Sequence, residues 1–177
     1  GIGKSTSKIF LDNGYKVICT YLKNNNNKNT KDIEYHRIDI TKSKDWENLA
    51  LYIKKKFKKI DVLVNSAGVR LSGNLETTSM SDWSYHLNNN VTGTFLACKY
   101  SLPFLKKAKN SSIINVASIN SIRGAKNMLA YATSKSAIIS FTASLALDLT
   151  KNKIRVNAVA PGAVSYTHLR AHETTRY

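Results

Sequence analysis

Short apolar runs alternate along this chain with longer segments of helical periodicity, and this alternation constrains the fold more than any other feature. The apolar runs cover residues 15–21, 33–40, 60–68, 111–118 and 153–162, whereas helical spacing covers 4–14, 44–58, 81–104 and 128–150. Strands that alternate with helices of this length form right-handed crossovers and a parallel sheet. The sequence therefore predicts an α/β fold, a doubly wound parallel sheet with helices on both faces.

The net charge of the chain bears on which classes of molecule it could bind. Lys and Arg number 27 against 11 Asp and Glu, a formal net charge of +16, which raises nucleic acid or an anionic membrane as partners. The lysines are scattered, however, and their one dense run, at 54–59, lies on a predicted helix. No apolar run approaches the roughly 20 residues of a membrane helix. We therefore expect a solvated lysine-rich face, with neither nucleic acid nor membrane as partner.

The cysteines and histidines carry no metal or disulfide signal. Cys19 and Cys98 stand in apolar surroundings without a CxxC motif or companion histidines, which indicates buried structural thiols and a reducing cytoplasm. His36 and His86 have no partners at ligand spacing. We expect a cytoplasmic protein with no metal site.

The strongest chemical signal is YATSK, which sets Tyr131 and Lys135 four residues apart near the start of a helix. One helical turn places the phenol beside the ammonium, and the cation favours the phenolate form. Ser118 stands thirteen residues before Tyr131 at the end of a strand, where its hydroxyl can hold a substrate carbonyl oxygen. Ligands of such sheets bind beyond the carboxyl ends of the strands, so we expect these three side chains at one edge.

The opening GIGKST fits two different motifs. It matches the end of a P-loop, with Lys4 and Ser5 on phosphates and Mg²⁺, and also the last part of a dinucleotide-binding glycine turn. A P-loop protein has no use for the YxxxK pair. We therefore interpret it as the glycine turn and place Lys4 on a helix surface.

Further pieces follow in a fixed order: DIT at 39–41, NSAG at 65–68, NVTG at 90–93 and PG at 161–162. Together with the glycine turn, Ser118 and YxxxK, they make the chain resemble the short-chain dehydrogenase/reductase family over residues 1 to about 163, and members similar to 3-oxoacyl-carrier-protein reductase in particular. The resemblance implies a Rossmann-like, three-layer fold that binds NADP or NAD.

The resemblance also implies roles for individual residues. Tyr131 would exchange a proton with the substrate oxygen, Ser118 would orient that oxygen, and Lys135 would bind the nicotinamide ribose. Asn90 would position a water that joins Lys135 to solvent. Asn65 would lie beneath the adenine ribose, although a structural, strand-linking amide is an equal interpretation. The implied cofactor-binding residues are Gly1, Ile2, Gly3, Asp39, Ile40, Asn65, Ala67, Gly68, Tyr131, Lys135, Pro161 and Gly162.

The choice between the two dinucleotides depends on the end of the first strand. Enzymes that prefer NAD place an acid there to accept from the ribose 2′-hydroxyl, and here the position holds Tyr21 with Lys23 nearby. The absence of a carboxylate slightly favours NADP over NAD.

Residues beyond 163 depart from the family pattern. The string VSYTHLRAHET resembles a translated sequencing adapter, so we interpret 1–163 as a partial dinucleotide-binding domain and 164–177 as a non-native tail. The resemblance implies that the first strand, the substrate lid and the last strand are missing. We expect this fragment, as written, to fold poorly and to be inactive.

Taken together, the sequence predicts an NAD(P)-dependent oxidoreductase that interconverts a carbonyl and a secondary alcohol of a small molecule. A 3-oxoacyl-carrier-protein reductase is a narrower alternative, because an acidic carrier suits a basic surface. A basic nucleotide- or nucleic-acid-binding scaffold is the non-enzymatic alternative, and it has no need for Tyr131, Lys135 and Ser118 together. The family resemblance implies a homotetramer of the intact parent, paired through helices at 81–104 and 128–150.

Overall fold

The computed structural model describes residues 1–23 and 27–162; the predicted tail 164–177 lies outside the described residues. Strands and helices alternate as expected from the sequence. In chain order the elements are α1 (Ile2–Asp12), β1 (Val17–Tyr21), β2 (Ile33–Arg37), α2 (Ser43–Lys56), β3 (Val62–Asn65), α3 (Met80–His86), η1 (Leu87–Thr92), α4 (Gly93–Leu105), β4 (Ser112–Val116), η2 (Ile119–Ser121), α5 (Leu129–Asp148), η3 (Thr150–Asn152) and β5 (Arg155–Val159). Each strand is shorter than its apolar run, because the residues at the ends of the runs lie outside the paired segments.

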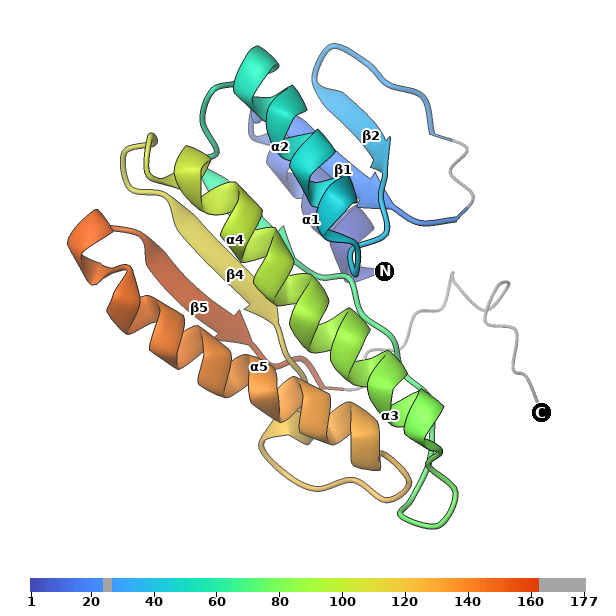
Figure 1. Cartoon of the computed structure of the whole chain (residues 1–177). Helices are drawn as coiled ribbons and strands as arrows, with labels where there is room; N and C mark the ends of the chain where they lie inside the picture. The colour runs from blue at the N-terminus through green and yellow to red at the C-terminus, as the bar shows by residue number, and fades with distance from the viewer. Residues whose placement is uncertain (24–26, 163–177) are drawn as a thin grey trace.

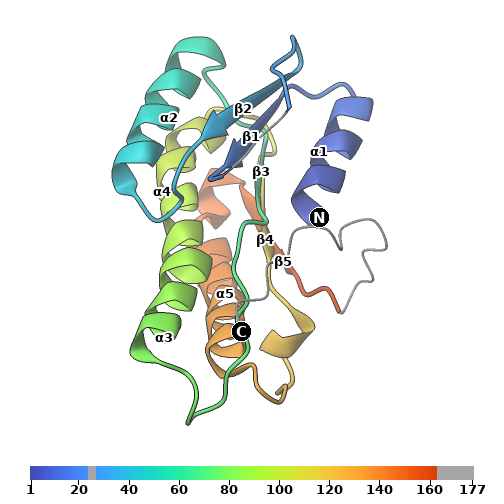
Figure 2. The ribbon, with the colours of Figure 1, turned by 90° about the vertical axis from the view of Figure 1, so that its right-hand side faces the viewer.

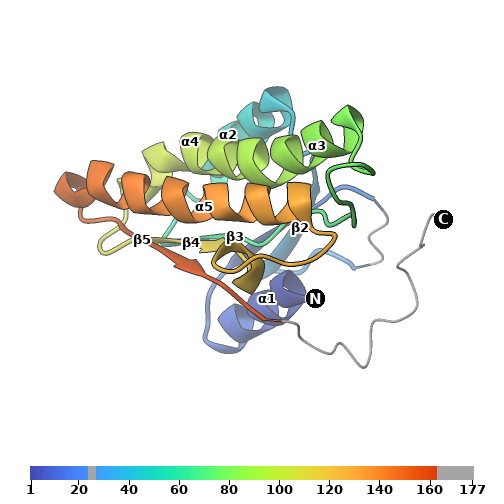
Figure 3. The same cartoon turned by 90° about the horizontal axis from the view of Figure 1, so that it is seen from below.

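The elements form three layers. All the strand pairs are parallel, with Val17 opposite Ile33 in one pair and Val62 opposite Ser112 in another. Helix α1 covers one face of the strands, and α2, α4 and α5 cover the other (Figure 3). The predicted three-layer, Rossmann-like α/β fold is confirmed.

The strands form two separate ladders. One has the order β1-β2 and the other the order β3-β4-β5, and within the described residues no ladder joins β1 to β3. In Figure 1 the arrows of β2, β4 and β5 point the same way, so both ladders share one direction. The family resemblance implies one further strand in the middle of the sheet, and the division lies between β1 and β3.

The predicted single helix over 81–104 is wrong in one respect. The segment runs helically from Met80 to Leu105, but its middle, Leu87–Thr92, is a π-helix between α3 and α4. Asn90 lies in this widened turn, where its buried side chain bonds to a neighbouring loop and to α5. Such π-turns are frequent at functional sites and follow from tertiary contacts, which a helical repeat in the sequence does not reveal.

Two apolar clusters hold the layers together. In the first, Trp46, Leu49 and Ile53 of α2 pack against Leu96 and other residues of α4, as their helical spacing predicts. The second lies between α4, α5 and the strands β4 and β5. The first cluster therefore joins α2, which follows the β1–β2 ladder in the chain, to α4, which packs beside the β3–β4–β5 ladder.

The two cysteines differ. Cys98 is buried in the second cluster, and burial raises the pKa of its thiol to about 12. The thiol therefore stays protonated and unreactive at neutral pH, in line with the predicted structural role. Cys19 is half-buried and lies 3.2 Å from Ser7 Oγ. Neither forms a disulfide. No helix among the described residues has the length and apolar character needed to cross a bilayer.

Candidate active site

Ser118 stands where two strand ends meet. Beyond β4 and β5 the chain segments run side by side, with Ala117 N–H donating to Val159 O at 2.8 Å and Ile119 N–H donating to Pro161 O at 2.9 Å. Ser118 is 7% exposed, and its Oγ accepts from Asn120 N–H at 3.2 Å. The hydroxyl is thereby fixed at the carboxyl edge of the sheet, with the predicted Pro161–Gly162 turn beside it.

Helix α5 brings Tyr131 and Lys135 to the same edge. Ser136 Oγ on its second turn donates to Ser121 O at 2.9 Å, which fastens α5 to the short helix that begins after Ser118. Lys135 Nζ donates to Val116 O at 2.7 Å, at the end of β4. The carboxyl end of β4 and the first turns of α5 therefore carry Ser118, Tyr131 and Lys135, three of the four predicted catalytic residues; the fourth, Asn90, lies in the π-helix.

Lys135 is a buried cation with unused donors. It is 5% exposed, and burial lowers the pKa of its ammonium to about 8. An ammonium has three N–H donors, and among the described residues one of them is engaged, at Val116 O. A Cβ added at Gly68 would lie 3.3 Å from Nζ and 3.0 Å from Asn90 Oδ1. The space beside the ammonium is therefore kept open by a glycine.

Asn90 acts as a clamp on the loop after β3. It is 1% exposed; its Oδ1 accepts from Val69 N–H at 2.8 Å, and its Nδ2 donates to Val69 O at 3.0 Å and to Ser134 Oγ at 2.8 Å. The side chain ties Val69, next to Gly68, to the helix of Tyr131 and Lys135. The structure thus brings Asn90, Gly68 and Lys135 together.

His86 is a site residue that sequence reasoning missed. It is 1% exposed, and its Nε2 accepts from Leu71 N–H at 2.9 Å, so Nδ1 donates to Asp82 O at 2.7 Å. Its ring lies 6.4 Å from the Tyr131 ring, edge to face. His86 therefore supports both the loop after β3 and the tyrosine. No motif signals it, because its partners are a backbone amide and a ring distant in sequence.

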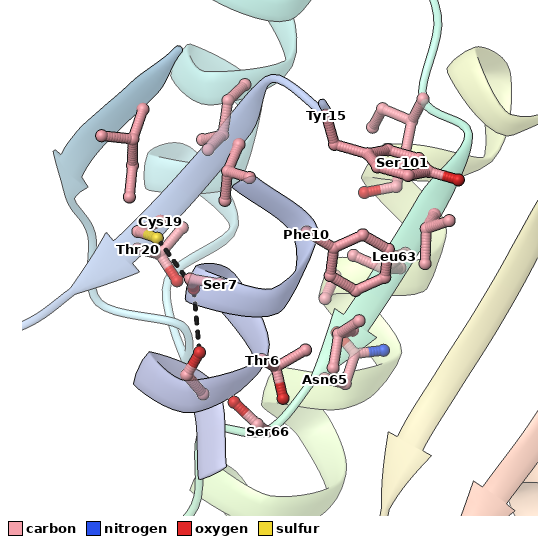
Figure 4. Close-up of a pocket in the computed structure, with 18 of the residues that line it drawn as sticks. Thr6, Ser7, Phe10, Tyr15, Cys19, Thr20, Leu63, Asn65, Ser66 and Ser101 are labelled. Atoms are coloured by element: carbon pink, nitrogen blue, oxygen red, sulfur yellow. Dashed lines mark hydrogen bonds between the residues drawn. The ribbon is translucent and has the colours of Figure 1, made fainter. Parts of the chain in front are cut away.

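On the cofactor side, the glycine turn meets the loop after β3. Helix α1 starts at Ile2 with Gly1 as its N-cap, and a Cβ added at Gly3 would lie 2.6 Å from Ser66 Oγ. Figure 4 shows Ser66 beside the first turn of α1. Lys4 is exposed, as expected for a helix surface residue. Open backbone N–H groups at a helix N-terminus favour an anion such as a pyrophosphate.

Asp39 and Ile40 follow β2. Asp39 Oδ1 accepts from Thr41 Oγ1 at 2.7 Å and from Thr41 N–H at 2.9 Å, and the hydroxyl contact first of all lowers the pKa of this carboxyl. Among the described residues, only one carboxylate oxygen is engaged. Ile40 packs against Gly93, where an added Cβ would lie 2.9 Å from its Cδ1. The pair thus lies between β2 and the start of α4.

Asn65 makes strand-linking contacts. Its Nδ2 donates to Asn115 Oδ1 at 2.8 Å, and Asn115 Nδ2 donates in turn to Thr142 Oγ1 at 2.9 Å. This buried chain of amides joins β3, β4 and α5. The contacts of the Asn65 side chain therefore match the structural, strand-linking interpretation.

Comparisons with known proteins identify the family of this chain. A family model described as short chain dehydrogenase matches residues 1–177. The chain belongs to the short-chain dehydrogenase family. This short-chain dehydrogenase is 37% identical over 174 residues to dehydrogenase/reductase SDR family member 6 of Aquarana catesbeiana, covering 96% of this chain and 69% of that protein.

Two further similarities concern the reaction and the cofactor. The 3-oxoacyl-[acyl-carrier-protein] reductase FabG of Chlamydia pneumoniae is 33% identical over 172 residues, which cover 93% of this chain and 69% of that protein. A solved structure of an ElxO variant with NADPH bound has a TM-score of 0.86 at 32% identity and covers 93% of this chain and 70% of its own. This short-chain dehydrogenase thus spans about seven tenths of the length of these relatives.

Proposed function

We propose that this chain forms the cofactor platform and catalytic edge of an oxidoreductase that uses NADP or NAD to interconvert a carbonyl and a secondary alcohol. The observation that carries the proposal is the buried Lys135 ammonium, which donates to Val116 O at the end of β4, two residues before Ser118, from a helix position one turn after Tyr131. A nucleotide- or nucleic-acid-binding scaffold does not need this arrangement. The family and the NADPH-bound relative support the same redox class.

The residues present fit a dinucleotide. Lys135 keeps N–H donors for ribose hydroxyls, Gly68 leaves room beside that ammonium, and the N-terminus of α1 offers amides to a pyrophosphate. Asp39 presents an ionised carboxylate to the adenine side. When bound, the nicotinamide supplies or accepts the hydride.

Proton transfer falls to this chain's own residues. In reduction, the Tyr131 phenol donates a proton to the substrate oxygen as the carbonyl carbon gains hydride, and solvent returns the proton to the phenolate. The Ser118 hydroxyl donates to the same oxygen and stabilises its developing negative charge. The Lys135 ammonium, held against Val116 O, stabilises the phenolate. In oxidation the same steps run in reverse.

Binding and turnover test different parts of the proposal. Because we expect slow or no turnover from the chain alone, a fluorescence titration with NADPH and NADH is the first readout, and saturable binding is expected, tighter for NADPH. Gly68→Val fills the space beside Lys135 and should weaken binding at least tenfold, whereas Gly124→Ala, in open space, should not. Absence of saturable binding, or equal binding by Gly68→Val, would contradict the proposal.

Tyr131→Phe separates catalysis from binding. It removes the transferable proton and leaves the ring against His86, so NADPH binding should stay within twofold while any carbonyl-dependent oxidation of NADPH falls by about 10²–10⁴-fold. The measurement is initial rate per bound cofactor. Full activity in Tyr131→Phe would exclude the phenol as the acid.

The narrower substrate class is an acyl group on an acidic carrier. Two observations favour it: similarity to a 3-oxoacyl-carrier-protein reductase, and the net charge of +16. Reduction of a 3-oxoacyl thioester on its carrier should then fall as salt rises, unlike reduction of a short, uncharged 3-oxo ester. A homotetramer and a cytoplasmic location of the intact parent are part of the same proposal.

A further inference from the structure

Three turns of the chain lie side by side at the amino ends of β3, β4 and β5. They stand at the ends of α2, α4 and α5 and comprise residues 57–61, 104–112 and 148–155. Ile60 N–H donates to Phe104 O at 3.2 Å, and Arg155 N–H donates to Ser111 O at 3.1 Å. Figure 1 shows α2, α4 and α5 ending along the same side of the molecule. The three turns therefore form one continuous surface.

This surface carries a strong excess of positive charge. The three turns hold eight basic residues against two acidic ones, Asp61 and Asp148, and Lys59 pairs with Asp61 at 2.7 Å. The other seven basic side chains are exposed and, within the described part of the chain, have no ion pair; we call them the basic rim: Lys58, Lys106, Lys107, Lys109, Lys151, Lys153 and Arg155.

Two lysines of the basic rim occupy backbone positions that favour glycine. Lys58 has a φ of 67° and Lys153 a φ of 55°, both in the left-handed region. A Cβ costs free energy there, which glycine avoids. The helix dipole favours a cation anywhere in the last turn, so it does not account for lysine at the strained position itself. Backbone strain that a glycine would remove points to a function for these two charges.

The composition of the three turns selects the kind of partner. None of the exposed large hydrophobic side chains of the described residues lies within them, and Leu147 stands one residue outside. A bilayer or a protein partner would need apolar anchors besides charge. Phe57 is half-buried and Phe104 is buried, so neither ring offers a platform for an unpaired base. The phosphate backbone of a duplex requires only cations at its surface.

We infer that the basic rim binds the phosphate backbone of double-stranded nucleic acid, without regard to base sequence. Neighbouring strands lie about 4.8 Å apart, so the three turns span about 10 Å, enough for a few consecutive phosphates. The expectation of a solvated lysine-rich face considered the run at 54–59. The tertiary structure adds cations from two other turns to the end of that run.

The basic rim and the candidate active site lie at opposite ends of the same strands. Ser118 follows the carboxyl end of β4, whereas the turn at 104–112 precedes its amino end. In Figure 2 the loops after β3 and β4 lie at the lower end of the molecule, and α2 ends at the upper end. A strand of five residues is about 17 Å long, so a duplex on the rim leaves the cofactor site open. The inference therefore does not depend on the proposed redox function.

Duplex DNA tests the inference on the full chain. The probes are two fluorescein-labelled duplexes of about 24 base pairs with unrelated sequences, titrated by fluorescence anisotropy from about 50 to about 200 mM salt. We expect saturable binding in the micromolar range at the lowest salt, equal within about twofold for the two sequences. The affinity should fall with salt along a double-logarithmic slope of about −3 to −5, because a few phosphates release their counterions.

A double variant separates charge from folding. Lys58→Gly with Lys153→Gly removes two rim charges and also relieves both strained positions, so the melting temperature should not fall by more than about 2 °C. Its duplex affinity should fall at least tenfold, and the magnitude of its salt slope should fall by about two. Asn110→Gly relieves the strained position of the middle turn, at φ 59°, without a change of charge and should bind as the parent does.

A second pair of variants controls for net charge. Lys4→Ala with Lys126→Ala removes the same charge from exposed positions at the opposite end of the molecule and should weaken duplex binding less than about threefold. If the double glycine variant proves unfolded, Lys106→Ala with Lys107→Ala tests the same rim on the exposed end of α4.

Three results would overturn the inference. The first is no saturable binding of either duplex, and the second is equal weakening by the rim variants and the opposite-end variant, which would mean that net charge alone acts. The third is tighter binding of anionic phospholipid vesicles or of polyglutamate than of duplex at equal charge concentration, which would assign the rim to a membrane or an acidic protein. NADPH titration of the same variants is scored separately, so failure here leaves the proposed function standing, and the reverse also holds.

Discussion

In the half of the molecule built by β3, β4, β5, α4 and α5, polar side chains are buried and bonded to one another across elements. Asn65, Asn115 and Thr142 form a continuous chain there, and Asn90 joins a loop to α5. In the half built by α1, β1, β2 and α2, the principal contacts are apolar, with a polar group around Glu34 near the surface. Ser118, Tyr131 and Lys135, the residues that we propose for catalysis, lie in the first half.

The two halves are thus held together by different kinds of contact. Buried amide networks fix directions, because each bond has a defined geometry and an unpaired member costs free energy. Apolar contacts hold layers together but tolerate displacement. We therefore expect the β3–β5 half to be the more rigid, as the proposed proton transfer requires, whereas the β1–β2 half contacts it mainly through apolar side chains of α2 and α4.

The largest effect is expected from breaking the amide chain. Asn115→Ala leaves Asn65 Nδ2 with only its weak contact to Cys98 Sγ, removes the donor to Thr142 Oγ1, and opens a small void. These losses should lower the free energy of unfolding by about 3 kcal/mol. Asn157→Ala on the exposed face of β5 is the matched control and should change it by under about 0.5 kcal/mol. Denaturant unfolding measures both, and equal effects would refute the role of the network.

Replacement of Lys135 is expected to raise the free energy of unfolding, by less than Asn115→Ala lowers it. Burial lowers the pKa of this ammonium to about 8, so below that pH the folded state carries the full cost of a buried charge. Lys135→Met removes the charge and should raise the free energy of unfolding at pH 7 by about 2 kcal/mol, after the lost hydrogen bond is deducted.

The pH dependence of this gain has a definite sign. Between pH 8 and the ordinary pKa of 10.5, the unfolded state binds more protons than the folded state, so the parent gains stability as pH rises and the difference from Lys135→Met shrinks. The exposed Lys107→Met should show no such trend. A difference that grows with pH in this window would contradict the assignment.

The smallest expected effect is a local one in the β1–β2 half, on hydrogen exchange in β2. Glu34 accepts from Tyr52 and from Lys56, the latter at 2.6 Å, and although burial alone would raise the pKa of its carboxyl, these bonds hold it below its ordinary value. Glu34→Gln should speed hydrogen exchange in β2 about fivefold near neutral pH and leave β4 unchanged.

The hydrogen-exchange rate of β2 in the parent protein should approach that of Glu34→Gln as pH falls through the lowered pKa of the Glu34 carboxyl. A carboxyl whose pKa is lowered in the folded state stabilises that state only while it is ionised, and protonation removes the stabilisation. The exposed Glu76→Gln is the control. Equal acceleration in β2 and β4 would mean that the two halves open together, which would contradict the division drawn above.

Much of the site could be predicted from the sequence, because its residues lie at strand ends or one helical turn apart. Tyr131 and Lys135 are neighbours in any helix, and Ser118 follows a strand whose carboxyl end must face the site in a parallel sheet. His86, Ser134 and Val116 O were not predicted. Their contacts cross between elements, and no local repeat encodes which backbone atom a buried side chain will meet.

The sequence by itself determined the alternation of strands and helices, hence the parallel three-layer fold, and it supplied the residues that we propose for proton transfer. Only the tertiary structure decided that Asn65 links strands, that Asn90 clamps a loop from a π-turn, and that β1 and β3 lie in separate ladders. The physical reason is one of range. Periodicity and turn chemistry act over a few residues, whereas hydrogen-bond partners and unpaired edges depend on packing between segments far apart in the chain.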